Sequence, residues 1–163
     1  MKEYVYLVGQ ISVDLPETYE WRSRVRKYFK DNDDIVIIDP CNNGFNQAML
    51  KKYAHLDKDR LQVYGEQGID ILVSKDYSFV ERSTIAIADL NIYDPQKAII
   101  GSYFELAWYY MHPDKTVVGV YAGDREKNGL HTRHPFVNQA VTTWVKTHEE
   151  ACELIRYYFI DEY

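Results

Sequence analysis

Five short apolar runs, rich in β-branched and aromatic residues, are spread along this chain of 163 residues. Each run is bounded by turn residues, and its apolar side chains are continuous instead of alternating with polar ones, so we predict buried strands. Continuous apolar strands separated by helices indicate a parallel sheet that is covered on both faces. The predicted strands cover residues 4–11, 35–39, 84–90, 116–122 and 143–146.

Helices are predicted between these strands. Pro16 suits the first turn of a helix, where its missing N–H costs nothing. Residues 40–65 combine turn chemistry with helix-forming residues of no clean period, so we expect an excursion with one or two short helices. The stretch 123–135, with its glycines and a proline, is expected to be a loop. The predicted helices cover residues 16–31, 67–82, 103–111, a segment near Asn138, and 149–159.

This pattern predicts a three-layer α/β fold, flavodoxin-like or Rossmann-like, with a five-stranded parallel sheet and helices on both faces. The length fits one domain over residues 1–163. Ligands of such sheets bind outside the carboxyl ends of the strands, at a topological switch point. We therefore expect the segments 9–12, 40–45, 89–94 and 122–124 to surround one crevice.

The charge balance argues against a nucleic-acid partner. The formal net charge is −6, and the basic cluster at residues 21–30 has the spacing of a solvated helix face. Cys41 and Cys152 lack metal-ligand spacing, which is typical of free thiols in a reducing compartment, and no metal site is expected. The sequence shows no signal peptide and no apolar run of membrane-spanning length, so we expect a cytoplasmic location and no membrane partner.

Glu105 is the carboxylate with the most informative neighbours. It is expected in the first turn of the predicted helix 103–111, beside Phe104, Leu106 and Trp108. A carboxylate held in apolar surroundings must be paired, hydrogen-bonded or used in chemistry. The residues alone leave two hypotheses open, a catalytic group and a structural cap.

Three further residues have ordinary roles when each is considered alone. Asp76, on the predicted helix 67–82, would be a solvated helix residue. Asp89 ends a predicted strand and would cap the following turn. Tyr6, within the first predicted strand, is most simply a core side chain.

The order of these residues resembles the nucleoside 2-deoxyribosyltransferase family. The relevant string runs from Asp76 through the strand to Asp89, and after a loop Gly101 precedes Glu105 by four residues in a Gly-x-x-x-Glu-Leu motif. The opening residues 5–9 are similar to that family's first strand and glycine loop, and residues 134–136 (His-Pro-Phe) fit many relatives. The resemblance spans nearly the whole chain, apart from the excursion at 40–65.

The resemblance implies a double displacement on a 2-deoxyribosyl group, with no metal or organic cofactor. Glu105 would be the nucleophile, Asp76 the acid that protonates the leaving base, and Tyr6 the residue that holds the Glu105 carboxylate. Asp89 and Asp94 become candidates for the sugar hydroxyls, and Asn138 for a neighbouring subunit's site. The expected substrate-binding residues are Gly9, Ser12, Asp89, Asp94, Gly101, Ser102 and Asn138.

Two other functions stay open. A related branch hydrolyses nucleoside 5′-monophosphates; Ser12 and Ser102 fit its phosphate cradle, but the first loop lacks the usual Arg and the acidic loops would repel a phosphate. A nucleoside is therefore the favoured substrate, of unassigned purine or pyrimidine preference. The second alternative is a non-catalytic module that senses a nucleotide-derived ligand.

A homo-oligomer with shared sites is also expected. The predicted helix 103–111 and the tail 156–163 are rich in aromatic residues and would leave an unusual apolar surface on a monomer. Relatives in the resembled family complete their sites across a subunit interface, which agrees with this expectation.

Overall fold

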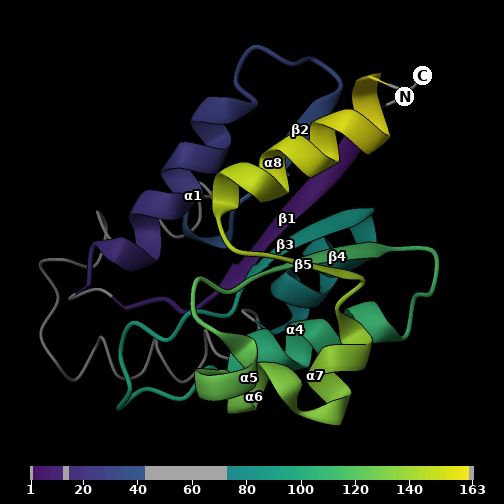
Figure 1. Ribbon diagram of the computed structural model, residues 1–163. Coiled ribbons are helices and arrows are strands. Elements are labelled where there is room, and N and C mark those ends of the chain that lie inside the picture. Colours follow the sequence, from purple (N-terminus) through teal and green to yellow (C-terminus); the bar gives the residue numbers. More distant parts are fainter. Residues whose placement is uncertain (1, 13–14, 43–72, 162–163) are drawn as a thin grey trace, which may run out of the picture.

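A computed structural model of the protein describes residues 2–12, 15–42 and 73–161. Five strands form one sheet in the order β2-β1-β3-β4-β5, and every pair of neighbours is parallel (Figure 1). The predicted fold class is confirmed. The strands are β1 (Glu3–Gly9), β2 (Ile35–Ile38), β3 (Ile85–Asp89), β4 (Thr116–Val120) and β5 (Thr143–Val145).

Helices cover both faces of the sheet. Figure 1 shows α1 (Glu17–Tyr28) and α8 (His148–Arg156) on one face, with α4 (Ile100–Tyr110) and α7 (Pro135–Ala140) on the other. Two separate hydrophobic clusters follow from the alternation of side chains along β1. Val5 and Leu7 pack with α1 and α8, whereas Tyr6 and Val8 pack with α4 and with the helical residues 73–82.

The strand order places the switch point between β1 and β3. The chain passes from β1 outward to β2 and then returns to pair β3 with the other edge of β1. The loops after β1 and β3 therefore leave the sheet side by side at its carboxyl edge, which is where ligands bind in sheets of this kind.

Several predicted boundaries are wrong. α4 begins at Ile100, three residues before the predicted start, so Glu105 lies in its second turn and not in its first. No side-chain cap marks this start, and Ile99 at the N-cap is buried, so tertiary packing set the helix start. α1 ends at Tyr28, and the closing helix gives way to a π-helical turn at Tyr157–Asp161.

The predicted loop at 123–135 contains two short helices. These are α5 (Arg125–Asn128) and α6 (Leu130–Arg133), and the Asp124 carboxylate caps the first by accepting hydrogen bonds from two backbone N–H groups. The predicted excursion at 40–65 falls largely outside the described residues, apart from a 3₁₀ turn at Pro40–Asn42. Among the helices that are described, none is both long and apolar enough to cross a membrane.

Candidate active site

A cavity of about 540 Å³ opens at the carboxyl edge of the sheet, at the switch point between β1 and β3. Its lining comes from the end of β1 and the next loop, from the helical residues 73–82, and from the start of α4. Five of the residues predicted from the sequence lie together there, namely Gly9, Asp76, Gly101, Ser102 and Glu105.

Glu105 and Tyr6 form a buried hydrogen-bonded pair at this cavity. The Tyr6 hydroxyl donates to Oε1 of Glu105 at 2.5 Å. Tyr6 is fully buried and Glu105 is only 8% exposed. The pair forms because Tyr6 points from the central strand toward α4, while Glu105 shares the sheet-facing side of α4 with Ser102, Leu106 and Tyr109. A hydrogen bond to a carboxylate is stronger than one between neutral groups, so it fixes the orientation of Glu105.

Burial raises the pKa of Glu105 from 4.5 to about 8. The hydrogen bond from Tyr6 opposes this shift, and the nearby charge of Asp76 adds to it. The pKa of Tyr6 is also raised, by burial and by the adjacent Glu105, so its hydroxyl keeps its proton. A carboxyl with such a displaced pKa inside a cavity is a typical candidate for a catalytic group.

Asp76 is the second carboxyl of the cavity. Burial raises its pKa, and the neighbouring Lys75 ammonium lowers it. Its Oδ1 atom is buried and has no hydrogen-bond partner among the residues that the structure describes. A raised pKa favours the protonated form, which is the form a general acid requires. The Asp76 side chain is half-buried, so the interpretation of Asp76 as a solvated helix residue is wrong.

The cavity also contains two cations that the sequence analysis did not single out. Arg22 and Lys97 both line it. The Lys97 ammonium donates a hydrogen bond to Ser12 Oγ at 2.9 Å and lies 3.6 Å from the nearer carboxylate oxygen of Asp94. Lys97 thus connects Ser12 and Asp94, neither of which lines the cavity itself, and its bond to Ser12 joins segments that are distant in sequence.

Arg22 corrects the interpretation of the basic cluster as a solvated face. It is 1% exposed and lies on the buried side of α1 with Thr18, Trp21 and Val25. Its guanidinium donates to the carbonyl oxygens of Gly9 and Gln10, and its Nε lies 3.6 Å from Oδ1 of Asp39. The helical spacing from Thr18 to Arg22 and from Trp21 to Val25 was the signal that could have placed Arg22 inside.

Asp89 faces away from the cavity. It ends β3 on the side of α1 and α8, where its carboxylate accepts from the Asn91 backbone, the Asn91 amide and the Tyr93 hydroxyl at 3.1, 2.6 and 2.7 Å. His148 Nε2 lies 3.4 Å from Oδ2 of the same carboxylate. These contacts are those of a turn cap, which was the ordinary reading of Asp89.

Gly9 and Asn138 have clear structural surroundings. A Cβ on Gly9 would lie 3.1 Å from the Asp89 backbone oxygen and 3.2 Å from the Trp21 ring, so close packing favours glycine there. Asn138 is exposed on α7, outside the cavity lining, and accepts a hydrogen bond from Arg125 at 2.7 Å. Within the described part of the chain, no group of three or more His, Cys, Asp and Glu residues could hold a metal ion.

These features define the class of the molecule. The chain is a flavodoxin-like α/β protein whose switch-point cavity holds a buried, hydrogen-bonded carboxyl and a second carboxyl with a raised pKa.

Two solved structures are similar to it. A conserved protein from Enterococcus faecalis V583 matches with a TM-score of 0.58 and 17% identity, over 96% of this chain and 99% of that one. A 2-deoxyribosyltransferase from Leishmania mexicana matches with a TM-score of 0.58 and 16% identity, over 97% and 99% of the two chains. No family model and no curated protein matches the sequence. The resemblance drawn from the motifs is therefore confirmed at the level of the fold.

The raised pKa of Glu105 predicts a pH-dependent stability difference between the wild-type protein and Glu105→Gln. Between about pH 4.5 and about pH 8, Glu105 carries a proton in the folded protein but has lost it in the unfolded chain. The free energy of unfolding of the wild-type protein therefore falls as the pH rises through this range. The glutamine amide of the variant does not titrate, and its oxygen can still accept the Tyr6 hydrogen bond. The variant should gain a few kcal/mol relative to wild type by about pH 9. Urea unfolding at several pH values measures this, and parallel pH profiles would contradict it.

Proposed function

We propose that this protein is a nucleoside 2-deoxyribosyltransferase, which cleaves the N-glycosidic bond of a 2′-deoxynucleoside and transfers the sugar to another nucleobase. The observation that carries the proposal is the buried Glu105–Tyr6 pair, with Asp76 in the same cavity. The fold shared with the Leishmania mexicana 2-deoxyribosyltransferase supports it. Retaining glycosyl transfer needs this combination of one carboxylate nucleophile and one acid.

The first step forms a bond between Glu105 and the anomeric carbon. As the carboxylate attacks, the bond from that carbon to the base nitrogen breaks, and the electron pair leaves with the base. Asp76 supplies the proton that the departing base takes up. The products are a free base and a glycosyl ester on Glu105, which is a covalent intermediate.

The second step reverses these roles. A nitrogen of the incoming base attacks the anomeric carbon, the ester bond to Glu105 breaks, and Asp76 recovers the proton from that nitrogen. Two inversions at one carbon retain the sugar configuration. Water in place of the base would give hydrolysis, so the balance of products depends on how well the site excludes water.

Tyr6 orients the nucleophile. Its hydroxyl donates a hydrogen bond to Oε1 of Glu105, and the Glu105 carboxyl lines the cavity in which a sugar would lie. The high pKa of Tyr6 keeps this donor protonated during the reaction. Because attack needs the ionised carboxylate, a pH rising toward the Glu105 pKa of about 8 increases the active form of the nucleophile, while the loss of the Asp76 proton limits turnover from the alkaline side.

Incubation with a 2′-deoxynucleoside, with and without a second free base, tests this proposal. We expect a new nucleoside when the second base is present, and a loss of at least about 10³-fold in kcat for Glu105→Ala. Glu153→Ala, which removes an exposed glutamate of α8, is the matched control and should keep full activity. Unchanged turnover in Glu105→Ala would refute the catalytic role. Ligand binding without any turnover in the wild-type protein would favour the sensing module instead.

A second candidate is an N-glycosidase that hydrolyses the N-glycosidic bond of a nucleoside or 2′-deoxynucleoside 5′-monophosphate. The observation in its favour is the Lys97 ammonium, which lies at the cavity and donates to Ser12 Oγ. Arg22 also lines the cavity, and the positive charges of the two side chains reduce the repulsion that the acidic loops would exert on a phosphate. Ser102, buried at the start of α4, lines the same cavity.

Lys97→Ala separates the two substrates. If a phosphate binds at Lys97, the variant should raise KM for the monophosphate by about 10-fold or more and leave KM for the nucleoside nearly unchanged. Lys127→Ala, an exposed lysine of α5 whose nearest carboxylate belongs to Asp124, is the control. Equal effects on the two substrates would remove the phosphate role.

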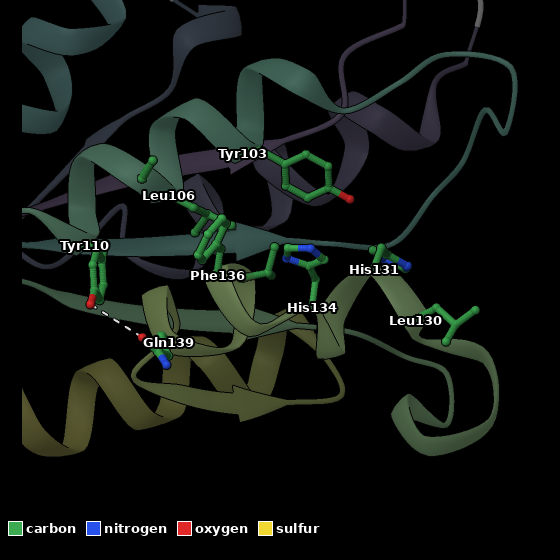
Figure 2. Close-up of a pocket in the computed structure, with 10 residues that line it drawn as sticks. Tyr103, Leu106, Tyr110, Leu130, His131, His134, Phe136 and Gln139 are labelled. Carbon is green, nitrogen blue, oxygen red and sulfur yellow. Dashed lines mark hydrogen bonds between the residues drawn. The ribbon is translucent and has the colours of Figure 1, made fainter.

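We also propose that a second copy of the chain covers the apolar surface between α4 and α7. Tyr103 and Tyr110 of α4 and Phe136 and Gln139 of α7 line a cavity of about 750 Å³, and Figure 2 shows Tyr110 hydrogen-bonded to Gln139. Phe136 is 81% exposed and Leu130 is 75% exposed, and an exposed apolar patch of this kind is typical of an interface. Asn138 lies on the same helix, α7, and would approach the neighbour's cavity in such an assembly.

Light scattering should therefore find a dimer or a larger oligomer at micromolar concentration. Phe136→Asp should shift the protein toward the monomer, because a charge would be buried in the interface. Tyr28→Asp, at a 39% exposed tyrosine that ends α1 on the other face of the sheet, controls for a general effect of added charge. A monomeric wild-type protein would contradict the proposal.

A further inference from the structure

Gln10 follows β1 and uses every hydrogen-bonding position of its side-chain amide. Its Nε2 donates to the carbonyl oxygens of Asp94 and Lys97, both at 2.9 Å. Its Oε1 accepts from the backbone N–H groups of Tyr93 and Asp94, also at 2.9 Å. An amide has two N–H donors and an oxygen with two lone pairs, so these four bonds satisfy it completely.

The backbone of Gln10 is itself anchored from the other side. The buried guanidinium of Arg22 donates to the carbonyl oxygen of Gly9 at 3.0 Å and to that of Gln10 at 3.3 Å. The same guanidinium lies beside Asp39, at the end of β2. Gln10 is therefore held by α1 and by its own strand, and its side chain is only 5% exposed.

The loop that Gln10 holds is packed at its start and exposed beyond it. Tyr93 packs against the cluster of α1 and α8 and donates to Asp89, whereas residues 95–98 are exposed. Exposed loop residues are normally mobile, and the four hydrogen bonds of the buried Gln10 amide hold the backbone at residues 93–97. The backbone groups of this loop depend on Gln10 for partners that water would otherwise supply.

This loop forms one wall of the cavity. Lys97, Ala98 and Ile99 line it, and α4 follows directly with Gly101 and Ser102. The catalytic pair does not depend on the loop in the same way. Tyr6 belongs to β1, Glu105 belongs to the second turn of α4, and Asp76 comes from the helical residues 73–82.

We propose that Gln10 is a positioning residue. It holds the backbone at residues 93–97, and through it the cavity wall formed by Lys97, Ala98 and Ile99, in place for the substrate, while the Glu105–Tyr6 pair is built independently. This inference rests on the proposed glycosyl transfer for its kinetic consequence. Its structural part does not depend on that function. This part is the set of four hydrogen bonds between the Gln10 side chain and the loop, called the clasp below.

Gln10→Ala should raise KM for the substrate by about 10-fold or more and change kcat by no more than about 3-fold. The reason is that the cavity wall would no longer be held in place for the substrate, whereas Glu105 would keep its geometry. Gln10→Glu is the second variant. Its carboxylate can accept from the two N–H groups but would face two carbonyl oxygens, so KM should rise at least as much. Gln96→Ala, on the exposed part of the same loop, is the matched control and should leave KM unchanged.

Amide hydrogen exchange tests the clasp directly. The N–H groups of Tyr93 and Asp94 should be protected in the wild-type protein and should lose protection in Gln10→Ala, while the central strand amides of Ile87 and Val118 keep theirs. Fast exchange at Tyr93 and Asp94 in the wild-type protein would overturn the clasp, whether or not the variants fold.

The two proposals fail in different ways. Protected amides in a protein that turns over no nucleoside or monophosphate would refute the proposed function and leave the clasp intact. Active wild-type protein, with lost protection but unchanged KM in Gln10→Ala, would refute the positioning role alone. A loss of kcat equal to the rise in KM would also overturn it, because the nucleophile would then depend on the loop.

Discussion

Parallel pairing of β1 with both β2 and β3 is the constraint on which the rest of the structure depends. Parallel neighbours require crossover helices, and these helices cover both faces of the sheet. The central strand must then be apolar on both sides, which places Val5 and Leu7 in one cluster and Tyr6 and Val8 in the other. It also brings the ends of β1 and β3 together, so their loops meet at a single edge.

Tyr6 shows how this constraint produces a site. A core position on a doubly covered strand can hold a polar atom only if that atom finds a partner. The partner is Glu105, from the helix that covers the same face. The pair therefore satisfies the tyrosine hydroxyl and leaves a carboxyl at the cavity with a pKa raised by burial. A carboxylate in that place destabilises the fold at high pH, which is a cost that a purely structural residue would not need to impose.

The loops at the edge are held by buried polar side chains as well as by apolar packing. Arg22 fixes the backbone after β1, Gln10 fixes the loop after β3, and Asp89 satisfies the turn that begins it. Each of these side chains is buried and hydrogen-bonded to backbone or neighbouring groups. Loops held in this way would not have to be ordered at the moment of binding, which lowers the entropic cost of binding.

Local sequence was enough to predict the strands and the fold class, because apolar runs depend only on neighbours along the chain. It singled out Glu105 as a carboxylate among apolar residues, and left its role open between a catalytic group and a cap. The tertiary structure decided where α4 begins, since the buried Ile99 and not a capping residue marks its start. It also decided that Arg22 is internal, that Asp89 caps a turn on the far face, and that Lys97 meets Ser12 across 85 positions of sequence. These features depend on hydrogen bonds and ion pairs between particular polar side chains. Their partners are distant in sequence and become neighbours only when the sheet has formed.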